Sequence, residues 1–258
     1  MLSITSIAKL LGSDILIHPF VKKRLKGVGY NLSVGSYAWS LSTKAPLLET
    51  ADKRAYIVQA GDTALIVTNE TIWVSSKVGG TFHSKVDRVS EGFSSISTTL
   101  DPEWIGPLLI AITNLTPNAI NLRKDDSFAT VAFYRLETPA IHYAKNAPGR
   151  TDRLSALGIS VSQEASDWFE REEHRSVNAL KEVVLASEEY KLLKAQFASA
   201  QFLRSYVLPA VPALLVLGSL IYAFTRPGLA PRQQLGPFIG ALVAALGILL
   251  SQFMSKQR

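Results

Sequence analysis

The stretch TTLDPEWIGPLLIAITN, residues 98–114, places a turn with polar side chains directly before a short apolar run. Short apolar runs bounded by turn residues predict β-strands rather than helices. The turn carries Asp101 and Trp104, which suit contact with a small molecule, whereas the run that follows holds no carboxylate. The stretch therefore predicts a strand beside a ligand site, and it leaves open whether the protein transforms the ligand or only binds it.

Apolar runs of the same kind recur on both sides of this stretch, through residues 1–145. They read YNLSVGSYAWSL, AYIVQ, TALIVT, TIWV and FATVAFYRL, and turn signals such as AGD, VGG and TPN separate them. A short first helix is expected after Ser3, because serine commonly caps helices. No helical pattern long enough for a parallel crossover lies between the runs. The sequence thus predicts a mainly β front domain, a distorted barrel or sandwich.

Composition narrows the chemistry that the protein can perform. The chain has 258 residues, 47% of them hydrophobic, and a formal net charge of +6, which favours an anionic ligand. The densest basic cluster, KKRLK at 22–26, is too short to predict a nucleic-acid partner, and a solvated loop face is the simpler interpretation. The absence of cysteine excludes disulfides and thiolate chemistry, and the four histidines lack metal-ligand spacing, so no protein-held metal is expected.

A helical neck is predicted within residues 146–204, because 162–204 contains neither proline nor glycine. Its apolar residues step alternately by four and three along one face: Ala179, Val183, Ala186, Tyr190, Leu193, Phe197 and Ala200. This spacing is typical of a coiled-coil seam and favours an oligomer with packed necks. The alternative is a helix that lies on the surface of its own domain.

Residues 205–254 are expected to form a transmembrane hairpin with spans at 205–224 and 235–254, neither of which contains a charged residue. Twenty helical residues rise about 30 Å, the thickness of the hydrocarbon core of a bilayer. Basic residues flank the hairpin more densely than they occupy its loop. The expectation is a two-pass membrane protein, with the lipid bilayer as a partner and with the N-terminal domain and the C-terminus facing the cytoplasm.

Five segments of the front domain, taken in order, resemble the dCTP deaminase and dUTPase family. They are ILIHPF (15–20), GYNLSVG (29–35), HSKVDRVSEG (83–92), LDPEWIG (100–106) and INLRKDDSFATVAFYRLETPA (120–140). The resemblance implies a β-rich fold that forms homotrimers. It also implies pockets between subunits that bind deoxynucleoside triphosphates together with magnesium.

The segment HSKVDRVSEG occupies the place of the family's phosphate-binding motif G-R-S-S-x-x-R-x-G. The resemblance implies that Ser84 and Arg88 approach phosphate, and a hydroxyl donor and a fixed cation suit a polyanion. His83 and Lys85 replace the first Arg and the second Ser of the motif and are further candidates for phosphate contact.

The segment LDPEWIG resembles the family's I-D-P-G-W-x-G turn. The resemblance implies that Asp101 contacts the sugar and helps to place a water, and Trp104 of the same turn joins the predicted nucleotide-binding residues. The alternative for Asp101 is purely conformational, because Asp before Pro commonly shapes a loop by bonding its own backbone.

The main departure from the family lies at Ala111. The family's catalytic Glu stands in the pattern L-E-F-x-N, and here the aligned residues read IAITN, with Ala111 at the Glu position. A methyl group cannot transfer protons, and the loss of a positioned acid–base group costs typically ~10²–10⁴-fold in rate. The closing C-terminal arm of the family is not recognisable either.

These observations predict a nucleotide-binding protein with impaired catalysis, acting as a nucleotide sensor coupled to a transmembrane effector in bacterial stress or antiphage defence. The alternative is an active membrane-tethered dCTP deaminase or dUTPase. A third reading is a membrane assembly protein that uses the trimeric β domain only as a scaffold.

Overall fold

The computed structural model describes residues 1–95, 97–141 and 147–202, and the isolated helical residues Leu214, Leu217, Gly218, Ile221, Gly240 and Val243. The chain divides into two compact units, Met1–Leu193 and Lys194–Arg258. The first unit contains both sheets and positions the candidate site.

The described strands and helices follow one another as a β-rich domain and then a helical segment. The strands are β1 (Ile15–His18), β2 (Leu25–Lys26), β3 (Gly29–Ser40), β4 (Leu48–Glu49), β5 (Ala55–Val58), β6 (Thr63–Val74), β7 (Val78–Ser84), β8 (Phe93–Ser94), β9 (Thr99–Leu100), β10 (Ile105–Asn114), β11 (Ile120–Arg123) and β12 (Ser127–Arg135). The α-helices are α1 (Ile4–Leu10), α2 (Val86–Ser90), α3 (Thr151–Ala156), α4 (Gln163–Phe169), α5 (Val177–Ala186) and α6 (Glu188–Phe202). The 3-10 helices are η1 (Lys22–Arg24), η2 (Pro148–Arg150) and η3 (Glu172–His174).

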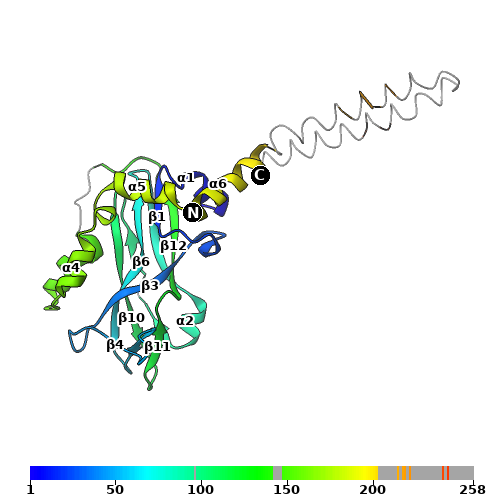
Figure 1. Ribbon diagram of the computed structural model, residues 1–258. Coiled ribbons are helices and arrows are strands. Elements are labelled where there is room, and N and C mark those ends of the chain that lie inside the picture. Colours follow the sequence, from blue (N-terminus) through cyan, green and yellow to red (C-terminus); the bar gives the residue numbers. More distant parts are fainter. Residues whose placement is uncertain are drawn as a thin grey trace. The chain divides into compact units, whose positions relative to one another are not determined.

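The strands form an antiparallel sheet in the order β8-β10-β6-β3-β12-β7-β9, with β1 paired to β6 and β2 to β3, and a small sheet β11-β5-β4. Figure 1 shows the long strands side by side, with β4 and β11 at one end of the domain and α1 and α5 at the other. The prediction of a mainly β front domain is confirmed. So is the short first helix, because the Ser3 side chain accepts a hydrogen bond from the Ser6 backbone N–H at 3.3 Å.

Strand β10 shows why the chain adopts this register. Leu108, Ile110 and Ile112 are buried on one face of the strand, whereas the alternate residues Leu109, Ala111 and Thr113 are half-buried or exposed on the other. Successive side chains of a strand point to opposite faces, so the apolar set defines the core side. Strand β6 lies between β10 and β3 and is buried along most of its length.

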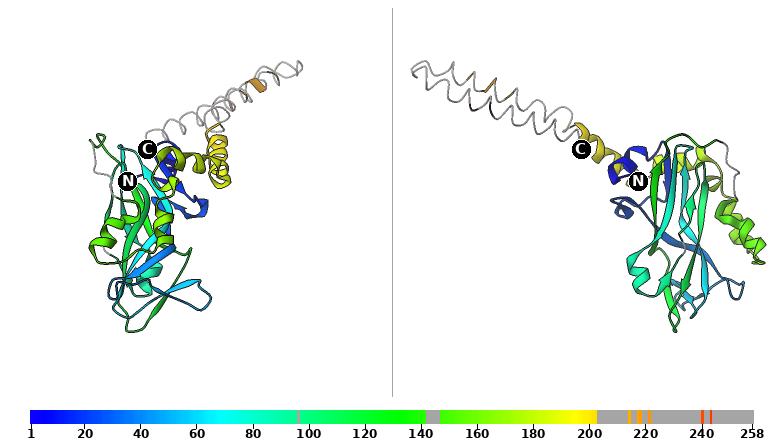
Figure 2. Two further views of the ribbon diagram at one scale, coloured as in Figure 1. Left: turned by 60° about the vertical axis from the view of Figure 1, so that its left-hand side comes forward. Right: turned by 180° about the vertical axis from the view of Figure 1, so that it is seen from behind.

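The segment that follows the β domain covers part of the outer face of β3 and β6. Trp39 of β3 and Leu65 of β6 form one hydrophobic cluster with Leu154 of α3 and Phe169 of α4. Figures 1 and 2 show α4 beside the sheet, on the opposite side from α2. Gly149 is required at this junction because its φ is +60° and an added Cβ would lie 2.1 Å from the Phe169 ring.

The helical segment differs from the predicted neck. The range expected as one long helix contains α4, η3, α5 and α6, and the backbone leaves the helical region at Ser187. Helix α5 buries Leu180 and Val184, which are not residues of the predicted seam. Tyr190 and Leu193, which are seam residues, are buried within the front unit. The continuous coiled-coil seam is therefore wrong, and for α5 the alternative of a helix lying on its own domain is confirmed.

The membrane prediction is also corrected. The predicted spans at 205–224 and 235–254 lie almost entirely outside the described residues. Of the helices that the structure describes, none has the length and apolar character needed to cross a bilayer. Helix α6, the longest of them, has 15 residues and begins with Glu188 and Glu189. The two-pass membrane localisation and the lipid bilayer partner are accordingly withdrawn.

Two histidines lie close together where η3 packs against the β domain. The His174 side chain is 4% exposed, its Nδ1 lies 2.8 Å from the Trp168 carbonyl oxygen, and its ring is centred 4.3 Å from the Trp168 ring. The Nδ1 atom of His18 is buried and has no hydrogen-bond partner in the described part of the chain. Burial lowers the pKa of both histidines, the charge of Glu173 opposes that shift, and a charge on His18 further lowers the pKa of His174.

The docking of the helical segment should therefore weaken in acid. A histidine whose pKa is lowered by folding contributes full stability above its unfolded pKa of about 6.5, and that stability is lost as the pH falls below this value. We expect the urea unfolding midpoint to fall between pH 7.5 and pH 5.5, and His174→Asn and His18→Asn each to reduce this difference. A pH difference that is unchanged in the double variant would contradict the assignment.

Candidate functional site

The turn before β10 is built from Asp101, Pro102, Glu103 and Trp104. The Trp104 backbone N–H donates to the Asp101 carbonyl oxygen at 3.2 Å, and Glu103 has a φ of +62°. Proline at the second position and a positive φ at the third define a type II turn. The Trp104 Nε1–H donates to the Gly106 carbonyl oxygen at 3.0 Å, which fixes the indole against the start of the strand.

The carboxylate of Asp101 is half-buried and accepts a hydrogen bond from the Thr99 hydroxyl at 3.3 Å. The turn itself is closed by the backbone bond between Trp104 and Asp101. The side chain of Asp101 therefore keeps acceptor capacity for a ligand, which is the feature that its predicted role requires.

Glu103 lies where the resemblance places a glycine, and its conformation is one that glycine adopts without steric cost. A non-glycine residue in the left-handed region costs roughly 1–2 kcal/mol, part of which is offset because glycine has more freedom in the unfolded chain. We expect Glu103→Gly to raise the free energy of unfolding by about 0.5–1 kcal/mol in urea titrations. Glu137→Gly, at an exposed residue outside the positive-φ set, is the matched control and should give no gain. Equal effects of the two changes would refute the strain argument.

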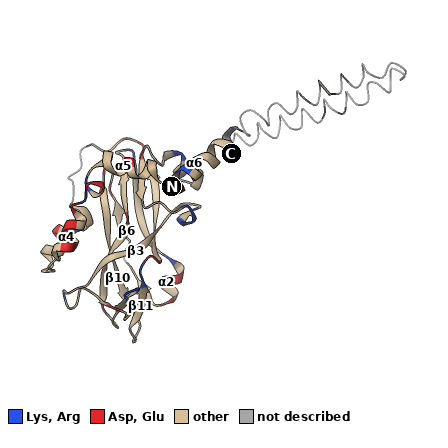
Figure 3. Cartoon of the chain, in the orientation of Figure 1, with Lys and Arg blue, Asp and Glu red and all other residues tan. Residues whose placement is uncertain are grey.

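The residues expected to hold phosphate lie together at the end of β7 and on α2. The Ser84 Oγ is 2.6 Å from the Ser95 Oγ, and the His83 Nε2 is 2.9 Å from the Thr81 Oγ1. The Lys85 Nζ lies 3.7 Å from an oxygen of Asp87. Figure 3 shows acidic and basic residues intermixed around α2.

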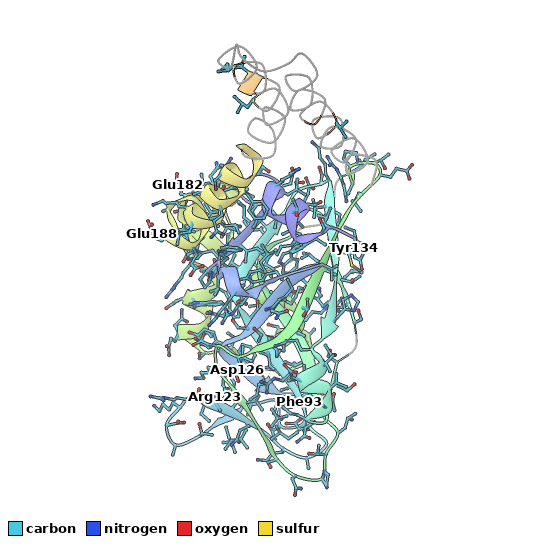
Figure 4. The ribbon with its side chains drawn as sticks, turned by 90° about the vertical axis from the view of Figure 1, so that its right-hand side faces the viewer. Phe93, Arg123, Asp126, Tyr134, Glu182 and Glu188 are labelled. Carbon is cyan, nitrogen blue, oxygen red and sulfur yellow. The ribbon has the colours of Figure 1, made fainter. Side chains whose placement is uncertain are left out.

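Arg88 is the most constrained cation of this group. Its guanidinium contacts Glu91 at 2.7 Å and Asp126 at 3.3 Å, and its side chain is 17% exposed. Figure 4 shows Asp126 at the same end of the domain as Phe93, away from Glu182 and Glu188. His83 and Ser84 end β7, Lys85 directly precedes α2, and Arg88 lies within it, so these four residues form one short lip at the end of β7.

Within one chain, this lip and the turn that carries Asp101 lie apart. Leu100, next to Asp101, is paired with Gly80 of β7, and Ser84 lies four residues further along that strand. A strand rises about 3.3 Å per residue, so roughly 13 Å separates the two positions along β7. Ala111 is on β10, and β6, β3 and β12 lie between β10 and β7 in the sheet order. The predicted site residues therefore form separate groups within one chain.

Ala111 lies on the outer, exposed face of β10, paired with Leu65 of β6. The next outward residue of the strand, Thr113, has its hydroxyl 2.9 Å from that of Thr63. Asn114 is fully buried and its amide nitrogen donates to three backbone carbonyl oxygens, so it serves the fold. The outward face of β10 presents a methyl group at the position where the resemblance places a carboxylate.

A buried carboxylate that the sequence reasoning missed is Glu70 of β6. Its side chain is fully buried, accepts from the Arg24 guanidinium at 2.7 Å, and accepts from the Ser33 backbone N–H and hydroxyl at 2.8 Å each. Burial raises its pKa, and the bonds from Ser33 and the charge of Arg24 oppose that shift. The signal was visible as a single Glu inside the apolar run TALIVTNETIWV.

Arg24 belongs to the basic cluster at 22–26, and it is not part of a solvated face. It also donates to the carbonyl oxygen of Asp125 at 2.7 Å, and Asp125 itself has a φ of +64°. Arg24 thus joins η1 and β6 to the turn before β12. Glu70 is enclosed by this network, whose hydrogen bonds connect β6 to Ser33 of β3 and to Arg24 of η1.

Removal of the Arg24 charge should leave Glu70 buried without its cation. We expect Arg24→Met to lower the free energy of unfolding by about 3 kcal/mol at pH 7.5, because an uncompensated buried charge is strongly unfavourable. The loss should shrink at lower pH, where Glu70 becomes protonated and neutral. Lys23→Met, at an exposed neighbour, is the control for urea unfolding. A loss that is independent of pH would argue against the ion pair as its cause.

Residues 1–136 match the family model described as dCTP deaminase-like. The chain belongs to the dCTP deaminase-like family. It is 32% identical over 139 residues to the dCTP deaminase of Pyrococcus furiosus, a match that covers 54% of this chain and 87% of that protein. It is 31% identical over 127 residues to the dCTP deaminase of Thermococcus kodakarensis, covering 49% of this chain and 80% of that one.

Solved structures with a similar arrangement include the 2'-deoxycytidine 5'-triphosphate deaminase of Agrobacterium tumefaciens. The identity is 13%, the TM-score is 0.42, and the match covers 51% of this chain and 46% of that chain. The family match ends at residue 136, so the helical segment beginning at 148 lies beyond it.

Proposed function

We propose that this protein binds a deoxynucleoside triphosphate without deaminating it and acts as a nucleotide sensor in stress or antiphage defence. The observation that carries the proposal is Ala111, outward on β10 where the family resemblance places the catalytic Glu. Deamination requires a group that deprotonates a water and protonates the leaving amine. The alanine side chain has neither an acidic proton nor a lone pair for this task.

The remaining residues support binding. A hydroxyl from Ser84 and a guanidinium from Arg88 suit the phosphates, and the Asp101 carboxylate suits a sugar hydroxyl. Because these groups lie apart on one chain, a nucleotide would contact both only if neighbouring subunits each supplied one group. This supports the proposal of a homotrimer with pockets between subunits. Magnesium would accompany the ligand through triphosphate oxygens, its usual mode in nucleotide sites.

A sensor also needs an element that distinguishes the bound state from the free state. Helices α3 and α4 lie beyond the family domain and pack on the outer face of β3 and β6, beside the strand that carries Ala111. We propose that ligand binding alters the packing of this segment.

The test uses the full-length chain with dCTP or dUTP and magnesium, with calorimetry for binding and chromatography for products. We expect binding without deamination, and an affinity at least about tenfold weaker for Arg88→Ala because a charge-assisted contact to phosphate is lost. Arg135→Ala, at an exposed arginine of β12, is the matched control. Deamination at ordinary enzymatic rates, roughly 1–10³ per second, would overturn the proposal. Release of pyrophosphate from dUTP would favour a dUTPase instead.

A further inference from the structure

The Arg88 guanidinium is held between two carboxylates from different parts of the chain. Its Nη1 donates to a Glu91 oxygen at 2.7 Å, and its Nη2 donates to an Asp126 oxygen at 3.3 Å. Glu91 follows α2 directly, whereas Asp126 comes from the turn between β11 and β12. The Nε of Arg88 is buried and has no acceptor within the described residues.

The position of Asp126 is fixed by the backbone around it. Its carbonyl oxygen accepts from the Val34 N–H at 3.0 Å, and the neighbouring Asp125 N–H donates to the Val34 carbonyl oxygen at 2.9 Å. Arg24 also donates to the Asp125 carbonyl oxygen. The carboxylate of Asp126 is therefore brought to Arg88 by a constrained turn.

Two other polar side chains of the lip also have partners within the chain. Lys85 lies beside Asp87, and the Ser84 hydroxyl contacts the Ser95 hydroxyl. Around the two cations, Lys85 and Arg88, stand three carboxylates, so the local formal charge does not favour a polyanion. A phosphate binds an arginine best through two parallel N–H groups, and here two of those groups are already engaged.

We propose that Glu91 and Asp126 act as internal competitors for Arg88 and set the affinity of the phosphate site. A triphosphate must displace both carboxylates, which then remain close enough to repel it. Magnesium bound to the triphosphate lowers that repulsion and so favours binding. The inference rests on the proposed function, because it concerns the regulation of the same site.

The experiment measures the affinity of the full-length chain for dUTP, dCTP and inorganic tripolyphosphate, with and without magnesium. We expect Glu91→Gln and Asp126→Asn each to tighten binding about three- to tenfold, because each change removes one negative charge close to the ligand. The gain should be larger without magnesium. Asp152→Asn is the matched control: Asp152 pairs with Arg150 at 3.1 Å, is 44% exposed, and lies on α3.

The outcomes distinguish the competitor role of Glu91 and Asp126 from the proposed nucleotide-binding function. Equal affinities for the wild type and both variants, or weaker binding by the variants, would overturn the competitor role and leave the proposed binding function intact. If neither the wild type nor any variant binds these ligands, including the double variant that combines Glu91→Gln with Asp126→Asn, both the competitor role and the proposed binding function are overturned. If Asp126→Asn does not fold, Asp126→Ser removes the same carboxylate and tests the same prediction. Thermal melting checks that each variant is folded.

Discussion

The pairing of β10 with β6 is the constraint on which the candidate site depends. Ile110 and Ile112 must face the core, and the two-residue period of a strand then directs Leu109, Ala111 and Thr113 outward. A slip of one residue would expose the isoleucines and bury Ala111, so the apolar set opposes any other register. The outward orientation of Ala111, on which the proposed function rests, is thereby fixed by the burial of its neighbours, with no contribution from Ala111 itself.

The register of β6 also explains where the helical segment packs. Leu65 and Val67 of β6 face outward beside Trp39 of β3, and in water this apolar surface would be unfavourable. Leu154 and Phe169 cover it and build a second hydrophobic cluster on the outside of the sheet. This cluster connects residues beyond the family domain to β3 and β6, and Leu109 of β10, the strand that carries Ala111, packs against it.

Two half-buried arginines of this domain, Arg24 and Arg88, pair with carboxylates of different exposure. Glu70 is enclosed and fully paired by Arg24 and Ser33, an arrangement that serves the fold. Arg88 is almost as buried as Arg24, but its two partner carboxylates lie closer to the surface. The difference lies in the exposure of the carboxylates: Glu70 is fully buried, whereas Glu91 and Asp126 stay about 40% exposed and can exchange partners.

The sequence by itself determined the β-rich class, the first helix, the turn at Asp101 and the position of Ala111, because strand alternation and turn chemistry are local properties. It misjudged the helical neck, because the same apolar residues suit a coiled coil or a helix packed on its own domain. Only the tertiary structure decided that Tyr190 and Leu193 are buried in the front unit, that Arg24 neutralises Glu70, and that Asp126 reaches Arg88. These outcomes depend on contacts between residues far apart in the chain, whose partners no local pattern encodes.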